Sequence, residues 1–120
     1  MNTEKIVRPW GTYEVLLDEN RYKVKRIVVD EMKRISYQSH ENRSELWVIT
    51  SGSGKVTIDD RVSIVGYNSI VSVPAAAKHR IENTSLERKL VFIEIQTGSS
   101  FLESDIKRFQ DDFGRVEEDV

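Results

Sequence analysis

The stretch ELWVITSGSGKVTID, residues 45–59, carries the pattern that decides the fold class of this chain. Its first part, ELWVIT, is rich in β-branched and aromatic side chains, which favour a β-strand. The glycine-rich SGSG follows as a turn, and KVTID resumes the strand pattern. Two such segments on either side of a glycine-containing turn predict a β-hairpin, so antiparallel pairing is expected here.

Segments of the same kind extend from this stretch toward both ends of the chain. We expect nine strands, at residues 12–17, 22–29, 34–38, 45–50, 55–59, 61–65, 69–73, 78–83 and 88–98. β-Branched residues dominate these segments, and turn residues separate them at regular intervals. Regular short strands predict a sandwich or a closed barrel, not a parallel sheet covered by helices. The fold class is therefore expected to be all-β.

The tail differs from the rest of the chain. Within residues 103–114, Ile106, Phe109 and Phe113 recur at helical spacing, and Gly114 follows as a stop signal. We expect a short C-terminal helix that packs these three apolar side chains against the flank of the barrel.

Length and composition limit the class of protein further. The chain has 120 residues, so we expect one domain over residues 1–120. Its 18 basic and 20 acidic side chains give a net charge of −2, which predicts no bulk attraction to nucleic acid. Cysteine is absent, which excludes disulfides, thiolate metal ligands and cysteine nucleophiles. No apolar run suits a membrane span or a signal peptide, so we expect no membrane partner and a cytoplasmic location.

Potential metal ligands gather around the central stretch. Gln38 and His40 are two residues apart on an expected strand and therefore share a face. Glu45 opens the next strand, where a desolvated carboxylate needs a positive partner. The second of the two histidines, His79, lies on a later strand. A single inward histidine is usually a core residue whose ring nitrogens are hydrogen-bonded. Two inward histidines together with a carboxylate and an amide favour a metal ion that all four bind.

Two short motifs carry a resemblance to a known superfamily. The pattern H-x-N-x-x-E-x6-G runs from His40 to Gly52, and P-x-A-x-x-H-x3-N runs from Pro74 to Asn83. Together they resemble the two motifs of the cupin superfamily. The resemblance implies a double-stranded β-helix, the cupin jelly roll, with a metal in the mouth of the barrel. Asn42 stands in the place of the usual second histidine of the first motif.

A closer resemblance covers nearly the whole chain. Its blocks are RPWGTYEVL, YKVKRIVV, SYQSHENRSELWVITSG, VPAAAKHRIEN and EIQTGSSFLESDIKRFQDDFGR. They are similar to successive blocks of the C-terminal isomerase domain of type II mannose-6-phosphate isomerase/mannose-1-phosphate guanylyltransferases. Asn42 and Leu46 stand where that family has histidines. The nucleotide-binding half of the family has no counterpart among these residues, so a stand-alone protein is expected.

The type I phosphomannose isomerases, which share the barrel, bind zinc through a Gln-x-His pair, a glutamate and a later histidine. The residues that match this pattern are Gln38, His40, Glu45 and His79, so the resemblance implies one divalent metal ion held by these four. A nitrogen and oxygen donor set suits zinc with an open position. Iron, manganese, cobalt and nickel remain open, since two histidines and a carboxylate also form the facial triad of iron enzymes.

The resemblance implies the interconversion of mannose 6-phosphate and fructose 6-phosphate by a stand-alone, metal-dependent isomerase. Such a reaction passes through an enediolate, whose negative oxygens a divalent metal stabilises. The phosphate of the substrate needs cationic partners. Arg43 is the candidate for either phosphate or enediolate binding, with Arg80, Lys23 and Lys25 as further phosphate ligands. Glu94 is the candidate base.

Two other functions remain open. An iron-dependent cupin dioxygenase uses the same ligands but needs no phosphate anchor, so Arg43 argues against it. A non-catalytic metal- and sugar-binding cupin follows if the residues at Asn42 and Leu46 abolish catalysis. Jelly rolls hide exposed strand edges by pairing, so we also expect a homodimer.

Overall fold

The structure, a computed structural model, describes residues 3–115, which form eleven strands and no helix. The strands are β1 (Ile6–Arg8), β2 (Gly11–Asp18), β3 (Tyr22–Val29), β4 (Tyr37–Ser39), β5 (Arg43–Ser51), β6 (Gly54–Ile58), β7 (Arg61–Val65), β8 (Ile70–Val73), β9 (His79–Glu82), β10 (Leu90–Gly98) and β11 (Lys107–Gln110). Each of the nine expected segments overlaps a strand. The single domain expected over residues 1–120 stays a prediction, and residues 1–2 and 116–120 lie outside the described residues. Within residues 3–115, no helix is long and apolar enough to cross a membrane.

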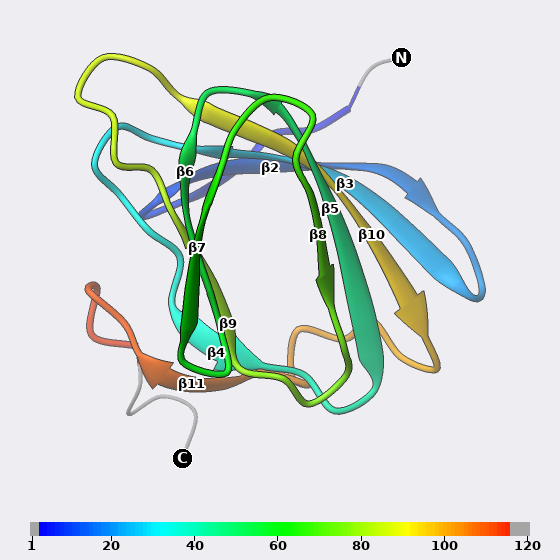
Figure 1. The fold of residues 1–120 in the computed structure, drawn as a ribbon. Helices are drawn as coiled ribbons and strands as arrows, with labels where there is room; N and C mark the ends of the chain where they lie inside the picture. Colours follow the sequence, from blue (N-terminus) through cyan, green and yellow to red (C-terminus); the bar gives the residue numbers. More distant parts are fainter. Residues whose placement is uncertain (1–2, 116–120) are drawn as a thin grey trace.

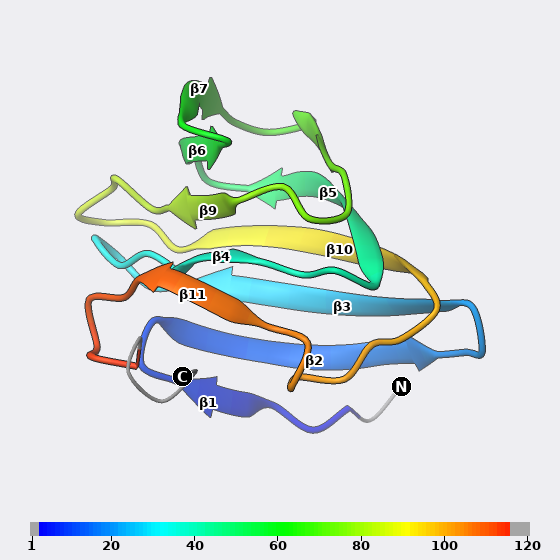
Figure 2. The same cartoon turned by 90° about the horizontal axis from the view of Figure 1, so that it is seen from below.

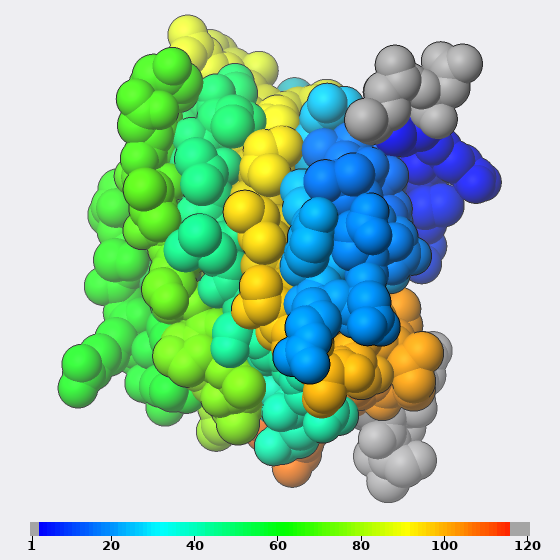
Figure 3. All heavy atoms as spheres, turned by 90° about the vertical axis from the view of Figure 1, so that its right-hand side faces the viewer, coloured from blue at the N-terminus to red at the C-terminus, as the bar shows by residue number. Residues whose placement is uncertain are grey.

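The strands form two antiparallel sheets that face each other (Figures 1 and 2). The six-stranded sheet has the order β1-β2-β3-β10-β5-β8, and the five-stranded sheet has the order β11-β4-β9-β6-β7. Figure 3 shows the outer face of the six-stranded sheet, where β5, β10, β3 and β2 lie side by side. Neighbours in space come from distant parts of the chain, as in a jelly roll. The all-β jelly-roll prediction is confirmed.

The hydrophobic core fills the space between the two sheets. Its largest fully buried apolar side chains are Trp47, Phe92, Ile49, Ile81 and Leu90. Burial of each such side chain stabilises the fold by roughly 1.5–3 kcal/mol. Every second residue of β5 and β10 points into this space, as expected for strands with one face on the core. The same alternation points four polar side chains into the barrel, namely Arg43, Glu45, Glu94 and Gln96.

The predicted hairpin at residues 45–59 is wrong. β5 pairs with β10 and β8, whereas β6 pairs with β7 and β9, so the SGSG turn carries the chain from one sheet to the other. Gly52 has a φ of 84°, and a Cβ there would lie 2.5 Å from the carbonyl oxygen of Lys89. The turn therefore requires glycine at this position. The neighbouring hairpin joins β6 to β7 through Asp59 and Asp60, which both adopt positive φ.

The predicted C-terminal helix is also wrong. Residues Lys107–Gln110 form β11, which pairs with β4. The edge of β4 offers unpaired backbone groups, and satisfying them outweighs the weak helical preference of a short segment. The ring of Phe109 lies against the ring of Tyr37, with 6.2 Å between the centroids. Phe113 packs against the core, so part of the expected apolar contact is made without a helix.

Candidate metal centre

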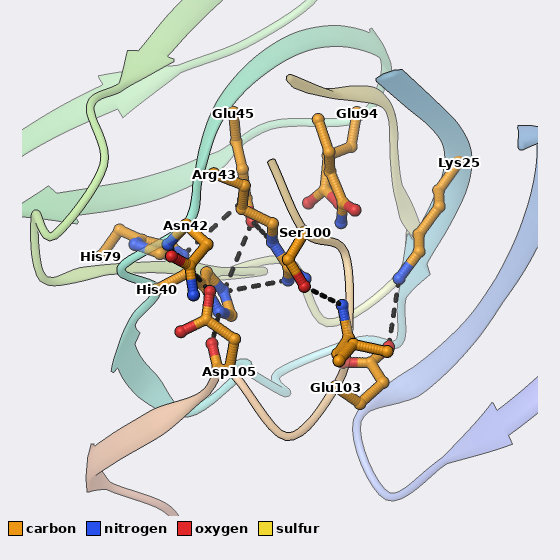
Figure 4. A network of polar contacts seen from close by, with 12 residues as sticks. Lys25, His40, Asn42, Arg43, Glu45, His79, Glu94, Ser100, Glu103 and Asp105 are labelled. Carbon is orange, nitrogen blue, oxygen red and sulfur yellow. Dashed lines mark hydrogen bonds and ion pairs between the residues drawn. The ribbon is translucent and has the colours of Figure 1, made fainter. Parts of the chain in front are cut away.

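Two histidines and a glutamate meet inside the barrel. His40 follows β4, Glu45 lies on β5, and His79 begins β9 (Figure 4). All three side chains are buried, and one ligand atom of each lies within 4.8 Å of the others. Residues nearly forty positions apart in the sequence are therefore brought to one point, which is able to hold a metal ion.

The two histidines present the nitrogen atoms that a metal requires. Nδ1 of His40 donates to the carbonyl oxygen of Asp105 at 2.7 Å, and Nδ1 of His79 donates to that of Ala77 at 2.9 Å. These bonds leave both Nε2 lone pairs directed at Glu45, at 3.4 Å and 3.6 Å from its carboxylate oxygens. Backbone acceptors of this kind fix the tautomer and the ring orientation of metal-binding histidines.

Burial keeps both rings neutral. It lowers the pKa of His40 to about 4 and lowers the pKa of His79, so each Nε2 carries a lone pair and no proton near neutral pH. The Nε2 atom of His79 is buried and has no hydrogen-bond partner within residues 3–115. A buried lone pair without a partner is unfavourable, and a metal ion would satisfy it. The residues present therefore fit a divalent metal.

The carboxylate of Glu45 is held from two sides. The indole N–H of Trp47 donates to Oε1 at 3.1 Å, and Nε of Arg43 donates to Oε2 at 3.2 Å. Nη2 of Arg43 also lies 3.1 Å from Nε2 of His40. Trp47 is thus a core residue whose hydrogen bond also orients this carboxylate.

A pocket of about 150 Å³ lies beside the three residues. Its lining includes Gln38, Lys25 and Glu94, as well as the apolar side chains of Ile27 and Phe92. Gln38 pairs with His79 across β4 and β9, so both side chains point to the same side of the sheet. The expected ligand Gln38 and the expected base Glu94 therefore line the same pocket as His40 and Glu45.

Glu94 is the most perturbed acid of the pocket. Its burial, together with the negative charge of Glu45, raises the pKa of Glu94 to about 7. The side chain of Gln96 donates a hydrogen bond to Glu94, while its own Oε1 has no partner within the described residues. Sequence reasoning missed Gln96, although it lies two positions after Glu94 on the same strand and so shares its face.

The expected phosphate ligands do not lie together. Arg43 and Lys25 line the pocket, but Lys23 does not. Arg80 lies on the outer side of the five-stranded sheet, where its Nε donates to the carbonyl oxygen of Ile35. Consecutive strand residues point to opposite faces, so an inward His79 requires an outward Arg80.

Asn42 and Leu46, the two positions that differ from the type II family, both lie outside the cluster of His40, Glu45 and His79. Leu46 is 37% exposed and points out of the barrel, between the inward-facing Glu45 and Trp47. Asn42 is exposed at the turn before β5, where its backbone N–H donates to Oδ2 of Asp105 at 2.9 Å. A histidine at position 46 would therefore not reach the metal centre. Asp105, which sequence reasoning missed, holds this turn and the ring of His40.

An antiparallel jelly roll that encloses two histidines and a glutamate defines a cupin-fold protein with a candidate metal site, and solved structures confirm the fold. Capsular polysaccharide assembling protein CapF from Staphylococcus aureus matches with a TM-score of 0.77 at 17% identity, over 92% of this chain and 32% of that chain. The cupin-2 domain Rru_A2000 from Rhodospirillum rubrum matches with a TM-score of 0.73 at 16% identity, over 86% of this chain and 78% of that chain.

The family follows from sequence comparison. This chain belongs to the family described as mannose-6-phosphate isomerase C-terminal, whose model matches residues 1–111. A mannose-1-phosphate guanylyltransferase of Escherichia coli K12 is 40% identical over 112 residues, which are 93% of this chain and 23% of the relative. Alginate biosynthesis protein AlgA of Pseudomonas aeruginosa is 38% identical over 114 residues, which are 95% of this chain and 24% of AlgA. The resemblance inferred from the sequence blocks is confirmed.

The prediction of a stand-alone mannose 6-phosphate isomerase is wrong. The relatives are named as guanylyltransferases and as alginate or xanthan biosynthesis proteins, and this chain spans only about a quarter of their length. In such enzymes the cupin is only the C-terminal domain. A resemblance between domains describes the fold and the site, not the whole protein in which the domain works.

Proposed function

We propose that this chain supplies a divalent-metal centre and a pocket for a phosphorylated sugar, with proton-transfer chemistry of the aldose–ketose isomerase type. It would act together with a guanylyltransferase unit as part of a mannose-phosphate enzyme. The observation that carries the proposal is the convergence of two neutral histidine nitrogens on Glu45, in a pocket that also contains Glu94. The names of the family and of its relatives support a mannose phosphate as the substrate class.

The proposed chemistry moves a proton between neighbouring carbons of an open-chain sugar. A bound divalent ion supplies Lewis-acid stabilisation of the negative charge that develops on the sugar oxygens. Glu94 takes the proton and returns it, because a pKa of about 7 allows both protonation states near neutral pH. Arg43, whose Nη1 has no hydrogen-bond partner within residues 3–115, donates to the enediolate. Gln96 accepts a hydrogen bond from a sugar hydroxyl through its free amide oxygen.

We propose zinc as the resident ion, with His40, Glu45 and His79 as ligands. Gln38 is the proposed fourth ligand, because its side chain faces the same pocket. Neutral imidazole nitrogens and a carboxylate suit zinc, and they also suit iron, manganese, cobalt or nickel. Metal analysis of the purified protein, followed by reconstitution with each ion, identifies the metal.

Deuterium incorporation tests the chemistry without assuming the product. Protein reconstituted with each metal is incubated with hexose phosphates in D₂O, alone and with a guanylyltransferase unit, and proton NMR follows the signal at C2. We expect metal-dependent loss of this signal. The variant Glu94→Gln should keep stoichiometric metal and lose the exchange, because an amide cannot accept the proton. Exchange that continues in this variant would refute the role of Glu94, and a wild-type protein that binds no metal would refute the proposal.

We also propose that a second copy of the chain covers one side of the barrel. Val62, Ile64, Tyr67 and Ile70 lie on or between β7 and β8 and are largely exposed. β7 and β8 are the end strands of their sheets. An end strand with apolar side chains is prone to pair, and a two-fold axis allows it to pair with its own copy. The cytoplasmic location expected from the sequence stays a prediction.

A further inference from the structure

Two cations lie against one aromatic ring at the wall of the pocket. The guanidinium carbon of Arg8 lies 5.2 Å from the ring centroid of Tyr13, and Nζ of Lys25 lies 4.5 Å from the same centroid. Arg8, Tyr13 and Lys25 belong to β1, β2 and β3, which are successive neighbours in the six-stranded sheet. All three residues line the pocket. The sheet therefore gathers two positive charges at one place on the pocket wall.

The two cations differ in their local partners. Glu94 lies opposite Lys25 on β10, and Glu103 forms an ion pair with Lys25, whereas the described partners of Arg8 are neutral. Lys25 is buried, and its ion pair is with Glu103, at 3.3 Å between Nζ and Oε1. The side chain of Glu103 is 58% exposed, so this ion pair is weak. Within residues 3–115, the hydrogen bonds of the Arg8 guanidinium go to neutral groups, namely the carbonyl oxygen of Val7 and the hydroxyl of Tyr13.

This wall is separate from the metal ligands. The two cations come from β1 and β3, whereas His40, Glu45 and His79 come from β4, β5 and β9 or from the turn beside them. Ile27 lies two residues after Lys25 on the same face of β3 and lines the same pocket. A ligand in this pocket therefore meets the metal ligands on one side and two cations on the other.

We propose that Arg8 and Lys25, held on the ring of Tyr13, form an anion subsite that binds the phosphate group of a phosphorylated sugar. The identity of the sugar rests on the proposed function, whereas the affinity for phosphate does not. A guanidinium donates to two phosphate oxygens at once, and a buried ammonium gains from a doubly charged partner. Phosphate replaces Glu103 beside Lys25, and the exposed carboxylate of Glu103 returns to water at little energetic loss.

Inorganic phosphate is the first probe, because it needs neither metal nor sugar. Isothermal titration of the metal-free full chain should show binding that weakens with added salt. The variants Arg8→Gln and Lys25→Gln should each lower the association constant at least about tenfold, since each removes a charged hydrogen bond. Tyr13→Leu should also lower it while both charges remain, and Tyr13→Phe should change it less because the ring is kept.

Lys23→Gln is the matched control. Lys23 lies on the same strand as Lys25, two residues away, but does not line the pocket. Its removal changes the net charge equally and should leave phosphate affinity unchanged. Equal losses in Lys23→Gln and Lys25→Gln would overturn the subsite, because they would indicate attraction by net charge only. Arg8→Gln changes an exposed residue, so it tests the subsite even if Lys25→Gln fails to fold.

Mannose 6-phosphate and mannose are the second pair of probes, titrated against metal-loaded protein. The phosphorylated sugar should bind more tightly than mannose in the wild type, and this difference should disappear in Arg8→Gln while the metal content stays the same. Phosphate affinity that is absent in the wild type, or unchanged in both Arg8→Gln and Lys25→Gln, would overturn the subsite. Phosphate binding without any metal binding would instead overturn the proposed function and leave the subsite intact.

Discussion

Nη2 of Arg43 lies 3.1 Å from Nε2 of His40, so a guanidinium occupies the lone pair that a metal ion would use. The same guanidinium donates to Glu45 through Nε. Arg43 would therefore compete with a metal ion for two of the proposed ligands, His40 and Glu45. A fixed cation of this kind keeps the buried carboxylate paired when metal is removed.

The variant Arg43→Met tests this competition. We expect it to bind metal about tenfold more tightly, because a competing hydrogen bond and a like charge are removed. Deuterium exchange into the sugar should fall by about a hundredfold, because the proposed enediolate donor is lost. Titration with zinc and the NMR assay measure the two effects. Weaker zinc binding in this variant would show that Arg43 supports the metal and does not compete with it.

The ligand assignment predicts the metal content of single variants. His79→Ala and Glu45→Gln should each strongly reduce the bound metal, measured by elemental analysis after dialysis. Each removes an imidazole or carboxylate donor and leaves a set of three proposed ligands that includes the weaker amide donor of Gln38. Leu46→His is the matched control. It restores a histidine that the type II family has, but the side chain points out of the barrel, so metal content should stay the same. A change in the amount of metal bound by Leu46→His would mean that the side chain at position 46 points into the barrel.

Asp105 is predicted to support the centre through the chain that it orders. Its carboxylate accepts hydrogen bonds from the backbone N–H groups of Glu41 and Asn42, at 3.1 Å and 2.9 Å. Asp105→Ala should lower the free energy of unfolding by about 1–2 kcal/mol. Metal affinity should fall by about tenfold, because the turn that carries His40 loosens.

Asp112→Ala is the control for this prediction. Asp112 makes a two-point ion pair with Arg34 on the surface, outside the lining of the pocket. Its loss also removes a carboxylate with two hydrogen bonds, but these go to Arg34 and not to the turn that carries His40. Urea denaturation and zinc titration of both variants separate the two effects. Equal metal affinity in Asp105→Ala and wild type would show that the hydrogen bonds of Asp105 are structural only.

The stability of the metal-free protein should depend on pH through Glu94. The pKa of Glu94 is about 7 in the folded state, above its ordinary value of 4.5, so the folded protein binds this proton more tightly than the unfolded chain. Its contribution is fully present below about pH 4.5 and is lost as pH rises through about 7. Glu94→Gln removes this dependence and should become more stable relative to wild type between about pH 5 and pH 8.5, by on the order of 2 kcal/mol.

His40 titrates in the opposite direction. Its pKa is lowered to about 4, so its contribution is present above about pH 6.5 and is lost as pH falls toward 4. The comparison of wild type with Glu94→Gln cancels this effect, because both proteins keep His40. Urea denaturation at several pH values in a chelating buffer supplies the measurement. A stability difference that does not change with pH would mean that Glu94 is ionised throughout.

The apolar patch on β7 and β8 predicts a dimer that a single charge disrupts. Ile64 is 78% exposed on β7, and a lysine there would have to be buried without a partner in a dimer. Ile64→Lys should therefore be monomeric in light scattering at concentrations where the wild type is dimeric. Leu86→Lys is the control, since Leu86 is equally exposed on a loop away from both strands. A wild type that is monomeric at all concentrations would contradict the prediction.

Much of the site could be predicted because strands have a strict period of two. The positions of nine strands followed from alternation and turn residues, and the inward face of β5 placed Glu45 and Trp47 together. The same rule would have excluded Arg80 once His79 was placed inside, and it would have found Gln96 beside Glu94. Arg80 was therefore wrongly included among the phosphate ligands, and Gln96 was missed, although the rule applies to both positions.

Other features could not be predicted from the alternation of residues along a strand. Alternation shows which side chains share a face of the sheet, but it does not show which strands pair. It could not tell that β5 and β6 lie in different sheets, or that the tail forms a strand on the edge of β4. Asp105 contacts His40 only because the fold brings together residues 65 positions apart, which no local pattern reports.

The sequence by itself determined the all-β class, the family and the four residues expected to bind metal, since these depend on local composition, spacing and motif. Tertiary structure alone decided which charges share the pocket. Lys25 and Arg43 lie in it while Lys23 and Arg80 lie outside, although all four are cations on strands. The physical reason is that charge effects depend on distance and burial, and both are set by how the two sheets pack.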